Sequence, residues 1–230
     1  MKQPILKFMM AAAIVGVAAL CFQSCKKDVK EKADGKAEKT TTARGALGQN
    51  NFNLWVTCGA APYNISGSNG ICVPVGNCST AINAAQQNGG QYASGMQFYG
   101  CFKGGSNANS GASEQAVFVC DNVQQWNGNE MGFVKTLENN DLKAYLQGGG
   151  QYITYLISDN DNGYHTYKCQ ARSNNTHMVD FYVDGTYKCT LTNNSGSYYN
   201  KWYYFVGTNH WYGGTNPTGQ QIEMYNMVTY

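Results

Sequence analysis

Short segments in which apolar and polar residues alternate recur from residue 91 to the C-terminus, and turn residues separate them. A period of two places successive side chains on opposite faces of a strand, so each segment predicts a β-strand with one buried face. No helical period in the chain exceeds two turns. Many short strands joined by turns are typical of an antiparallel sandwich or barrel. The expected strands are Gly95–Phe102, Gln115–Cys120, Met131–Thr136, Leu142–Gln147, Tyr152–Ser158, Tyr164–Arg172, Met178–Val183, Thr186–Thr192, Trp202–Thr208 and Ile222–Val228.

Residues 50–230 are expected to form one folded domain, which begins with a strand at Phe52–Val56. The chain has 17 Tyr and 27 Gly but only 13% charged residues, a composition that favours strands and turns over surface helices. Residues 57–90 are rich in Gly, Ser and Asn, so we expect long loops there, with a short helix at Thr80–Gln87.

The N-terminus resembles a bacterial lipoprotein signal peptide, residues 1–24. Two lysines precede an apolar run over residues 8–21, which is too short to span a bilayer. Cys25 follows the small residue Ser24 and precedes a charged run, as in a lipoprotein processing site. A lipid on Cys25 would anchor the protein to the cell envelope, at the outer membrane; plain secretion is the alternative.

The segment 25–49 is expected to be a flexible linker, because it is rich in Lys, Glu, Ala and Thr without apolar periodicity. Residues 1–48 hold nine of the 16 basic and four of the 14 acidic residues, so the remainder has seven basic and ten acidic residues, a net charge of −3. Nucleic-acid binding needs clustered Lys and Arg, so no nucleic-acid partner is expected.

The cysteines of the domain suggest disulfides, since export makes disulfides plausible. Their number is odd, so at least one thiol is left over or pairs between chains. No Cys-x-x-Cys occurs and the three His have no ligand spacing, so neither a metal nor a cofactor is expected. The seven cysteines are Cys58, Cys72, Cys78, Cys101, Cys120, Cys169 and Cys189, and the sequence leaves their pairing open.

Two segments, Tyr164–Lys168 and Val179–Gly185, resemble the signature hairpin of the concanavalin A-like jelly rolls, in which a His-Thr-Tyr strand precedes a Phe-Tyr-Val-Asp-Gly strand. That superfamily includes laminin G-like modules and family 16 glycoside hydrolases. The resemblance covers about residues 91–230 and implies an all-β fold, an antiparallel jelly-roll β-sandwich. It is modest evidence for function, because one fold hosts many activities.

Family 16 enzymes carry a Glu-x-Asp-x-Glu strand whose carboxylates share one face, and two of them perform the chemistry. The best-placed counterpart here begins at Glu114, but Ala116 and Phe118 replace the Asp and the second Glu. The resemblance therefore implies that this chemistry is absent, and no catalytic residue is assigned. A hydrolase would need another carboxylate, so Glu114 with Asp121 or Glu130 is the pair to test. Otherwise Glu130, Glu138, Asp141 and Glu223 are expected to be solvated turn or strand-end residues.

Jelly-roll alginate lyases are similar at Tyr204-Phe205-x-Gly207 and in a Ser-Glu core, matched here by Ser113-Glu114. Alanines stand where their arginines would bind the uronate, and their Gln-Ile-His strand has no counterpart. His210 and Tyr204 remain a possible base and acid pair.

Residues 201–212 form the densest aromatic run of the chain. Sugars stack their C–H faces on exposed rings, while amides and imidazoles bond their hydroxyls, so this run suggests a glycan groove. Because of the strand period, at least half of its side chains must instead point into the core. A tryptophan in a Gln-Gln-Trp-Asn-Gly loop is a further candidate. The candidate carbohydrate-binding residues are Trp126, Trp202, Tyr204, Asn209, His210, Trp211 and Tyr212, the last two expected beyond the strand end.

The leading hypothesis is a cell-envelope lipoprotein whose β-sandwich binds a polysaccharide without cleaving it. One alternative is a polysaccharide-degrading hydrolase or lyase of the same fold, which should show a carboxylate pair in a cleft. Another is a structural or adhesive module, which should show a flat apolar patch.

Overall fold

The computed structural model describes residues 52–56, 61–74, 81–87, 91–104, 113–121, 128–136, 141–159, 162–211 and 220–230. These residues form fifteen β-strands, and no helix among them could cross a membrane. The strands are β1 (Phe52–Val56), β2 (Tyr63–Ile65), β3 (Gly70–Pro74), β4 (Ala81–Gln87), β5 (Gln91–Ala93), β6 (Gly95–Lys103), β7 (Ser113–Cys120), β8 (Glu130–Thr136), β9 (Asp141–Gly148), β10 (Gln151–Asp159), β11 (His165–Ala171), β12 (Met178–Val183), β13 (Thr186–Thr192), β14 (Lys201–Trp211) and β15 (Gln221–Thr229).

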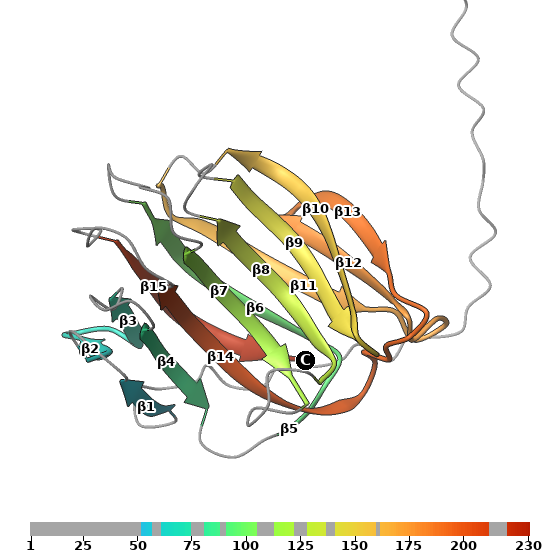
Figure 1. The fold of residues 1–230 in the computed structure, drawn as a ribbon, viewed down its shortest axis with the longest axis horizontal. Helices are drawn as coiled ribbons and strands as arrows, with labels where there is room; N and C mark the ends of the chain where they lie inside the picture. Colours follow the sequence, from blue (N-terminus) through green and yellow to red (C-terminus); the bar gives the residue numbers. More distant parts are fainter. Residues whose placement is uncertain are drawn as a thin grey trace, which may run out of the picture. The chain divides into compact units, whose positions relative to one another are not determined.

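The strands form two antiparallel sheets (Figure 1). The eight-stranded sheet has the order β1-β4-β14-β7-β8-β9-β10, and β5 pairs with one end of β14. The seven-stranded sheet has the order β13-β12-β11-β6-β15-β3-β2. The expected antiparallel jelly-roll sandwich is therefore confirmed.

Strand alternation builds the core between the two sheets. On β7 the inward residues are Val117 and Val119, and on β6 they include Phe98 and Phe102. Aromatic rings pack together there: Phe98 stacks on Tyr167 at 5.0 Å between centroids and makes T-shaped, edge-to-face contacts with Phe102 and Phe133. Such edge and offset contacts add to the stabilisation that burial alone provides.

The β12–β13 hairpin has the bounds that the sequence predicts, residues 178–183 and 186–192. Its two turn residues both have positive φ, 51° at Asp184 and 73° at Gly185, as the tight turn favoured by Asp-Gly requires. The Asp184 carboxylate accepts hydrogen bonds from the Thr166 backbone N–H at 2.8 Å and from His165 Nδ1 at 2.6 Å. The turn is thereby tied to β11, which explains why the His-Thr-Tyr segment and the Asp-Gly segment occur together.

The expected strand at residues 52–56 and those from residue 95 onward are confirmed, with ends that shift by three residues or fewer. The predicted helix at Thr80–Gln87 is wrong, because Ala81–Gln87 is β4, paired with β1 on one side and β14 on the other. The stretch read as loops up to residue 90 also contains β2 and β3. Pairing with strands that are distant in the sequence determines the secondary structure of these segments.

The expected disulfides are not found among the described cysteines, all of which are buried thiols. The register of the strands explains why these cysteines are not paired. Cys72 and Cys101 both lie opposite Glu223, on either side of β15, and Cys169 and Cys189 both lie opposite Phe181, on either side of β12. Each pair is thus two strand spacings apart, about 10 Å, which is beyond the Cα separation that a disulfide can bridge. Cys58 and Cys78 lie outside the described residues, as do Cys25 and the predicted signal peptide and linker.

Candidate functional site

A second hydrophobic cluster lies on the outer face of the eight-stranded sheet, the face turned away from the core. It consists of residues that alternate with the core residues along the same strands. These are Ala116, Phe118, Cys120, Val134, Tyr145 and Val206, with Tyr204 packed against them. Each of the first six is buried, which is unusual on the outside of a sandwich.

Five residues of this face form what we call the transverse row, because they lie opposite one another on successive strands. Tyr204 of β14 pairs with Cys120, Cys120 with Glu130, Glu130 with Gln147, and Gln147 with Tyr152 of β10. Directly paired residues of an antiparallel sheet point to the same face. Four strand spacings separate the two tyrosines, a span of about 19 Å across the sheet.

Glu130 occupies the middle of the transverse row and is only 4% exposed. Its Oε2 lies 3.5 Å from the Tyr145 hydroxyl, and its Oε1 is buried without a hydrogen-bond partner among the described residues. Burial raises the pKa of Glu130 to about 8, the negative charge of Asp121 adds to the rise, and the hydrogen bond from Tyr145 opposes it. The side chain is therefore a neutral carboxylic acid at pH 7, and the expectation of a solvated Glu130 is wrong.

Exposed aromatic rings stand at both ends of the row. On β14, Trp202 is 46% exposed and makes a T-shaped, edge-to-face contact with Tyr92 at 5.2 Å between centroids. At β10, Tyr152 is 52% exposed and leans on the buried ring of Tyr145 at 5.5 Å. The outer face thus presents rings to solvent on either side of a buried acid.

Glu114 does not form a carboxylate pair with Glu130. Glu114 lies opposite Thr136, six residues along β7 from the position opposite Glu130. Six residues of strand rise correspond to about 20 Å between the backbones, far more than the 5–10 Å that separates the carboxyl groups of glycosidases. Burial also raises the pKa of Glu114, with Lys143 acting in the opposite direction.

Asp121 is the carboxylate that follows Cys120 at the end of β7. Its two oxygens accept hydrogen bonds from the backbone N–H and the side-chain amide of Asn129, both at 2.6 Å. These bonds tie the end of β7 to the start of β8. Asp121 lies seven residues beyond Glu114 along the strand, so Glu114 pairs neither with Asp121 nor with Glu130, the two partners that the sequence suggested. The charge of Asp121 acts on Glu130 instead.

On β8, Glu130, Gly132 and Val134 share the outer face, since Met131 and Phe133 point into the core. A Glu at the first position is thus followed by no carboxylate at the third or fifth. The same holds on β7, where Ala116 and Phe118 lie in the second cluster. Neither strand can supply the three carboxylates of a Glu-x-Asp-x-Glu motif.

The structure places only some of the predicted carbohydrate-binding residues on the outer face. Trp202 and Tyr204 lie on the outer face, whereas Tyr203 and Phe205 between them are buried in the core, as the strand period predicts. Asn209, His210 and Trp211 belong to β14, so the expectation that Trp211 lies beyond the strand end is wrong. Trp126 and Tyr212 lie outside the described residues.

Sequence reasoning missed Tyr92, Tyr145 and Tyr152, whose membership of this face depends on pairing between strands. It also misplaced Glu223, which is 8% exposed rather than solvated. No group of three or more His, Cys, Asp or Glu in the described part of the chain could hold a metal ion.

No protein-family model and no curated protein matches the chain. Solved structures do share its fold. A native glycosidic hydrolase aligns with a TM-score of 0.58 at 12% identity, over 82% of this chain and 94% of that one. SCLam, a non-specific endo-β-1,3(4)-glucanase from family GH16, gives 0.56 at 9% identity, over 82% and 86%. Crh5 transglycosylase in complex with NAG gives 0.55 at 12% identity, over 81% of each chain. The concanavalin A-like jelly-roll fold implied by the hairpin is therefore confirmed.

Proposed function

We propose that the domain binds a polysaccharide across the outer face of the eight-stranded sheet, without cleaving it. The observation that carries this proposal is the transverse row together with Trp202, because the exposed rings of Trp202 and Tyr152 stand on either side of the buried acid Glu130. A glycan lying across the strands would stack on Trp202 near one end and on Tyr152 at the other. The other carboxylate of β7 and β8, Glu114, lies about 20 Å from Glu130 along the strands, which argues against a two-carboxylate mechanism on these strands.

A glycan-cleaving enzyme is the second candidate, and two observations favour it. The proteins that share the fold are glucanases, hydrolases and transglycosylases, which supports an enzyme at least as well as a binding protein. Burial also raises the pKa of Glu130 and the charge of Asp121 adds to the rise, and a carboxyl group with a raised pKa is the usual general acid of such enzymes. In this alternative Glu130 would protonate the departing glycosidic oxygen.

Replacing Trp202 by alanine is expected to weaken polysaccharide binding at least about fivefold, because the loss of an anchoring ring typically costs more than 1 kcal/mol. Affinity electrophoresis of the domain in laminarin, mixed-linkage β-glucan and chitin oligosaccharide would measure the effect. The control is Tyr155→Ala, which removes an equally exposed ring of β10 at a position that alternates with Tyr152. Reducing ends are assayed in the same samples.

Two outcomes would count against non-catalytic binding at this face. If the Trp202 variant binds as tightly as the unmodified domain, the face is not the binding surface. If reducing ends appear with the unmodified domain and disappear with Glu130→Gln, the enzyme is the correct alternative.

We also propose that Cys25 carries a lipid that anchors the domain to the outer membrane, on the basis of the sequence around it. Replacing Cys25 by serine is expected to move the protein from the membrane fraction to the soluble exported fraction. Fractionation followed by intact-mass measurement tests this. An unmodified Cys25 in the mature chain would refute it.

A further inference from the structure

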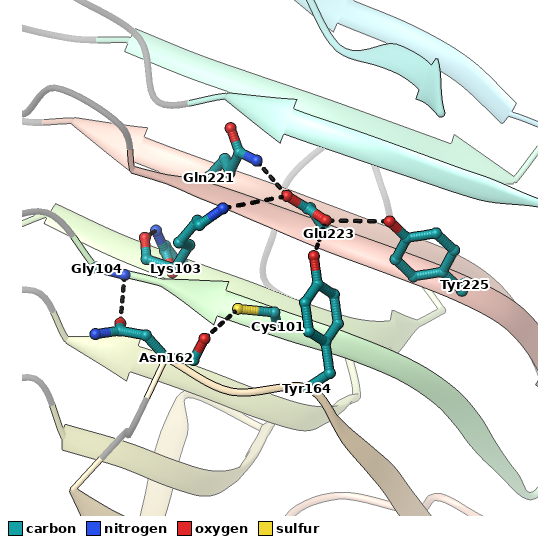
Figure 2. A network of polar contacts seen from close by, with 9 residues as sticks. Cys101, Lys103, Gly104, Asn162, Tyr164, Gln221, Glu223 and Tyr225 are labelled. Atoms are coloured by element: carbon teal, nitrogen blue, oxygen red, sulfur yellow. Dashed lines mark hydrogen bonds and ion pairs between the residues drawn. The ribbon is translucent and has the colours of Figure 1, made fainter. Parts of the chain in front are cut away.

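The carboxylate of Glu223 lies on the outer face of the seven-stranded sheet, opposite the proposed glycan face, and is surrounded by donors (Figure 2). Tyr164 and Tyr225 donate their hydroxyl protons to Oε2, the latter at 3.1 Å. Gln221 donates its amide to Oε1, and Lys103 Nζ lies 3.8 Å from the same oxygen. Both oxygens are thus satisfied and the charge is compensated within the network.

Burial would raise the pKa of Glu223, but the hydrogen bonds from Tyr164, Gln221 and Tyr225 outweigh it and hold that pKa below its ordinary value. Glu223 is therefore ionised at neutral pH. An ionised acceptor makes the stronger kind of hydrogen bond, so it fixes the two tyrosine hydroxyls firmly.

The backbone before β11 brings Tyr164 to this network. Asn162 has a φ of 60° and is bonded to the end of β6. Its side-chain oxygen accepts from the Gly104 N–H at 2.7 Å, and its carbonyl accepts from Cys101 Sγ at 3.0 Å (Figure 2). Two residues later the Tyr164 side chain reaches across Cys101 to Glu223.

Three rings gather above the carboxylate, and we call them the tyrosine platform: Tyr99, Tyr164 and Tyr225. Tyr99 stacks on Tyr164 with centroids 5.6 Å apart and an interplanar angle of 24°, and Tyr225 lies 6.1–6.2 Å from both. Tyr99 and Tyr164 remain 44% and 42% exposed. Because Tyr164 and Tyr225 donate their hydroxyl protons to Glu223, their phenolic oxygens can act only as hydrogen-bond acceptors toward a ligand.

We propose that the tyrosine platform is a second polysaccharide-binding site, on the face opposite the transverse row. Its exposed rings match the C–H face of a sugar, and the phenolic oxygens match hydroxyl donors at the edge of that sugar. A neutral glycan fits better than a charged one, since Lys103 already compensates Glu223. Rings that are pinned before binding lose little conformational freedom when the ligand arrives. The inference rests on the proposed function only in taking a polysaccharide as the ligand.

The test compares Tyr99→Ala with Tyr187→Ala in the same three polysaccharides. Tyr187 is an exposed ring on the same sheet, but it belongs to β13 and lies outside the platform. We expect Tyr99→Ala to weaken binding at least about fivefold at one of two sites, and Tyr187→Ala to leave it unchanged. Isothermal titration with short oligosaccharides gives the number of sites, two for the unmodified domain and one for each of Tyr99→Ala and Trp202→Ala.

The outcomes separate the two proposals. Loss of binding in the Tyr99 variant with none in the Trp202 variant supports the platform and refutes the transverse row. The reverse result refutes the platform alone. An unmodified domain that binds none of the three polysaccharides refutes both, and equal losses in the Tyr99 and Tyr187 variants refute the platform as a defined site.

Glu223→Gln tests whether Glu223 positions the rings. The hydrogen bond to Glu223 is the main cause of the raised pKa of Tyr164, so its removal should shift tyrosine ionisation to lower pH, read as absorbance near 295 nm. Glycan binding should weaken in parallel. An unchanged titration curve would show that Glu223 does not hold the hydroxyls.

Discussion

Replacing Glu130 by glutamine is expected to stabilise the domain by about 4 kcal/mol at pH 8, because the folded protein no longer has to bury an ionising carboxyl group. Glutamine has nearly the shape of the protonated side chain and keeps an acceptor for the Tyr145 hydroxyl. The gain should vanish at pH 4, where glutamic acid is neutral in the folded and the unfolded chain alike.

The direction follows from proton linkage. The pKa of Glu130 rises from 4.5 in the unfolded chain to about 8 in the folded domain. Between these values the folded state holds a proton that the unfolded state has lost, so stability falls as the pH rises through this window. The contribution is fully present below pH 4.5 and is lost as the pH passes 8.

Urea unfolding at pH 4, 6 and 8 measures the free energy of unfolding of both proteins. The control is Asp141→Asn, which changes a carboxylate at the other end of the sheet that lies 3.9 Å from Lys143. The difference between the Glu130 variant and the unmodified domain should grow steadily with pH and should exceed the difference for the control at pH 8. A constant difference for Glu130→Gln would mean that Glu130 is solvated.

Replacing Gly132 by alanine is expected to destabilise the domain by about 3 kcal/mol or more, at the upper end of what overpacking costs. A Cβ at this position would overlap the Val117 carbonyl oxygen and lie 2.5 Å from Phe118 Cβ. The Phe118 and Tyr145 rings make a T-shaped contact with centroids 6.0 Å apart over this part of the sheet, so neither ring can move easily. An aspartate at residue 132 would need the same Cβ, so the close strand approach itself opposes a Glu-x-Asp-x-Glu pattern on β8.

Thermal and urea unfolding check the effect against Thr154→Ala, an exposed residue of the same face opposite Tyr145. The Thr154 variant should stay within about 0.5 kcal/mol of the unmodified domain. If Gly132→Ala lowers the free energy of unfolding by no more than Thr154→Ala does, β7 and β8 are farther apart than in the structure.

Local sequence was sufficient to predict the bounds of a strand where the strand and its turn both have clear sequence patterns. The β12–β13 hairpin was predicted to the residue, because alternation and Asp-Gly are both local. Prediction from local sequence failed at Ala81–Gln87, because Ala and Gln favour helices. Only pairing with the flanking strands β1 and β14 makes this segment a strand.

The site was less predictable than the fold, because a charged residue near a strand end is usually solvated. What buries Glu130 and Glu223 comes from elsewhere in the chain: Tyr145 lies 15 residues from the former, and Tyr164 lies 59 residues from the latter. The same limit applies to the cysteines. Cys72 and Cys101 lie on the two strands that flank β15, too far apart for a disulfide, and this is known only once the strand register is known.

The position of β14 has a consequence for the order in which the chain can assemble. β14 separates β4 from β7, and β15 separates β3 from β6, so two strands that are synthesised after all the other described strands occupy the interior of both sheets. Until residues 201–229 are available, the pairings of the described strands join β1–β4 to none of β5–β13. The nascent chain therefore cannot close either sheet, and contacts of such long sequence separation form slowly. Completion of the sandwich must await the synthesis of residues 201–229, whatever compartment the chain has reached by then.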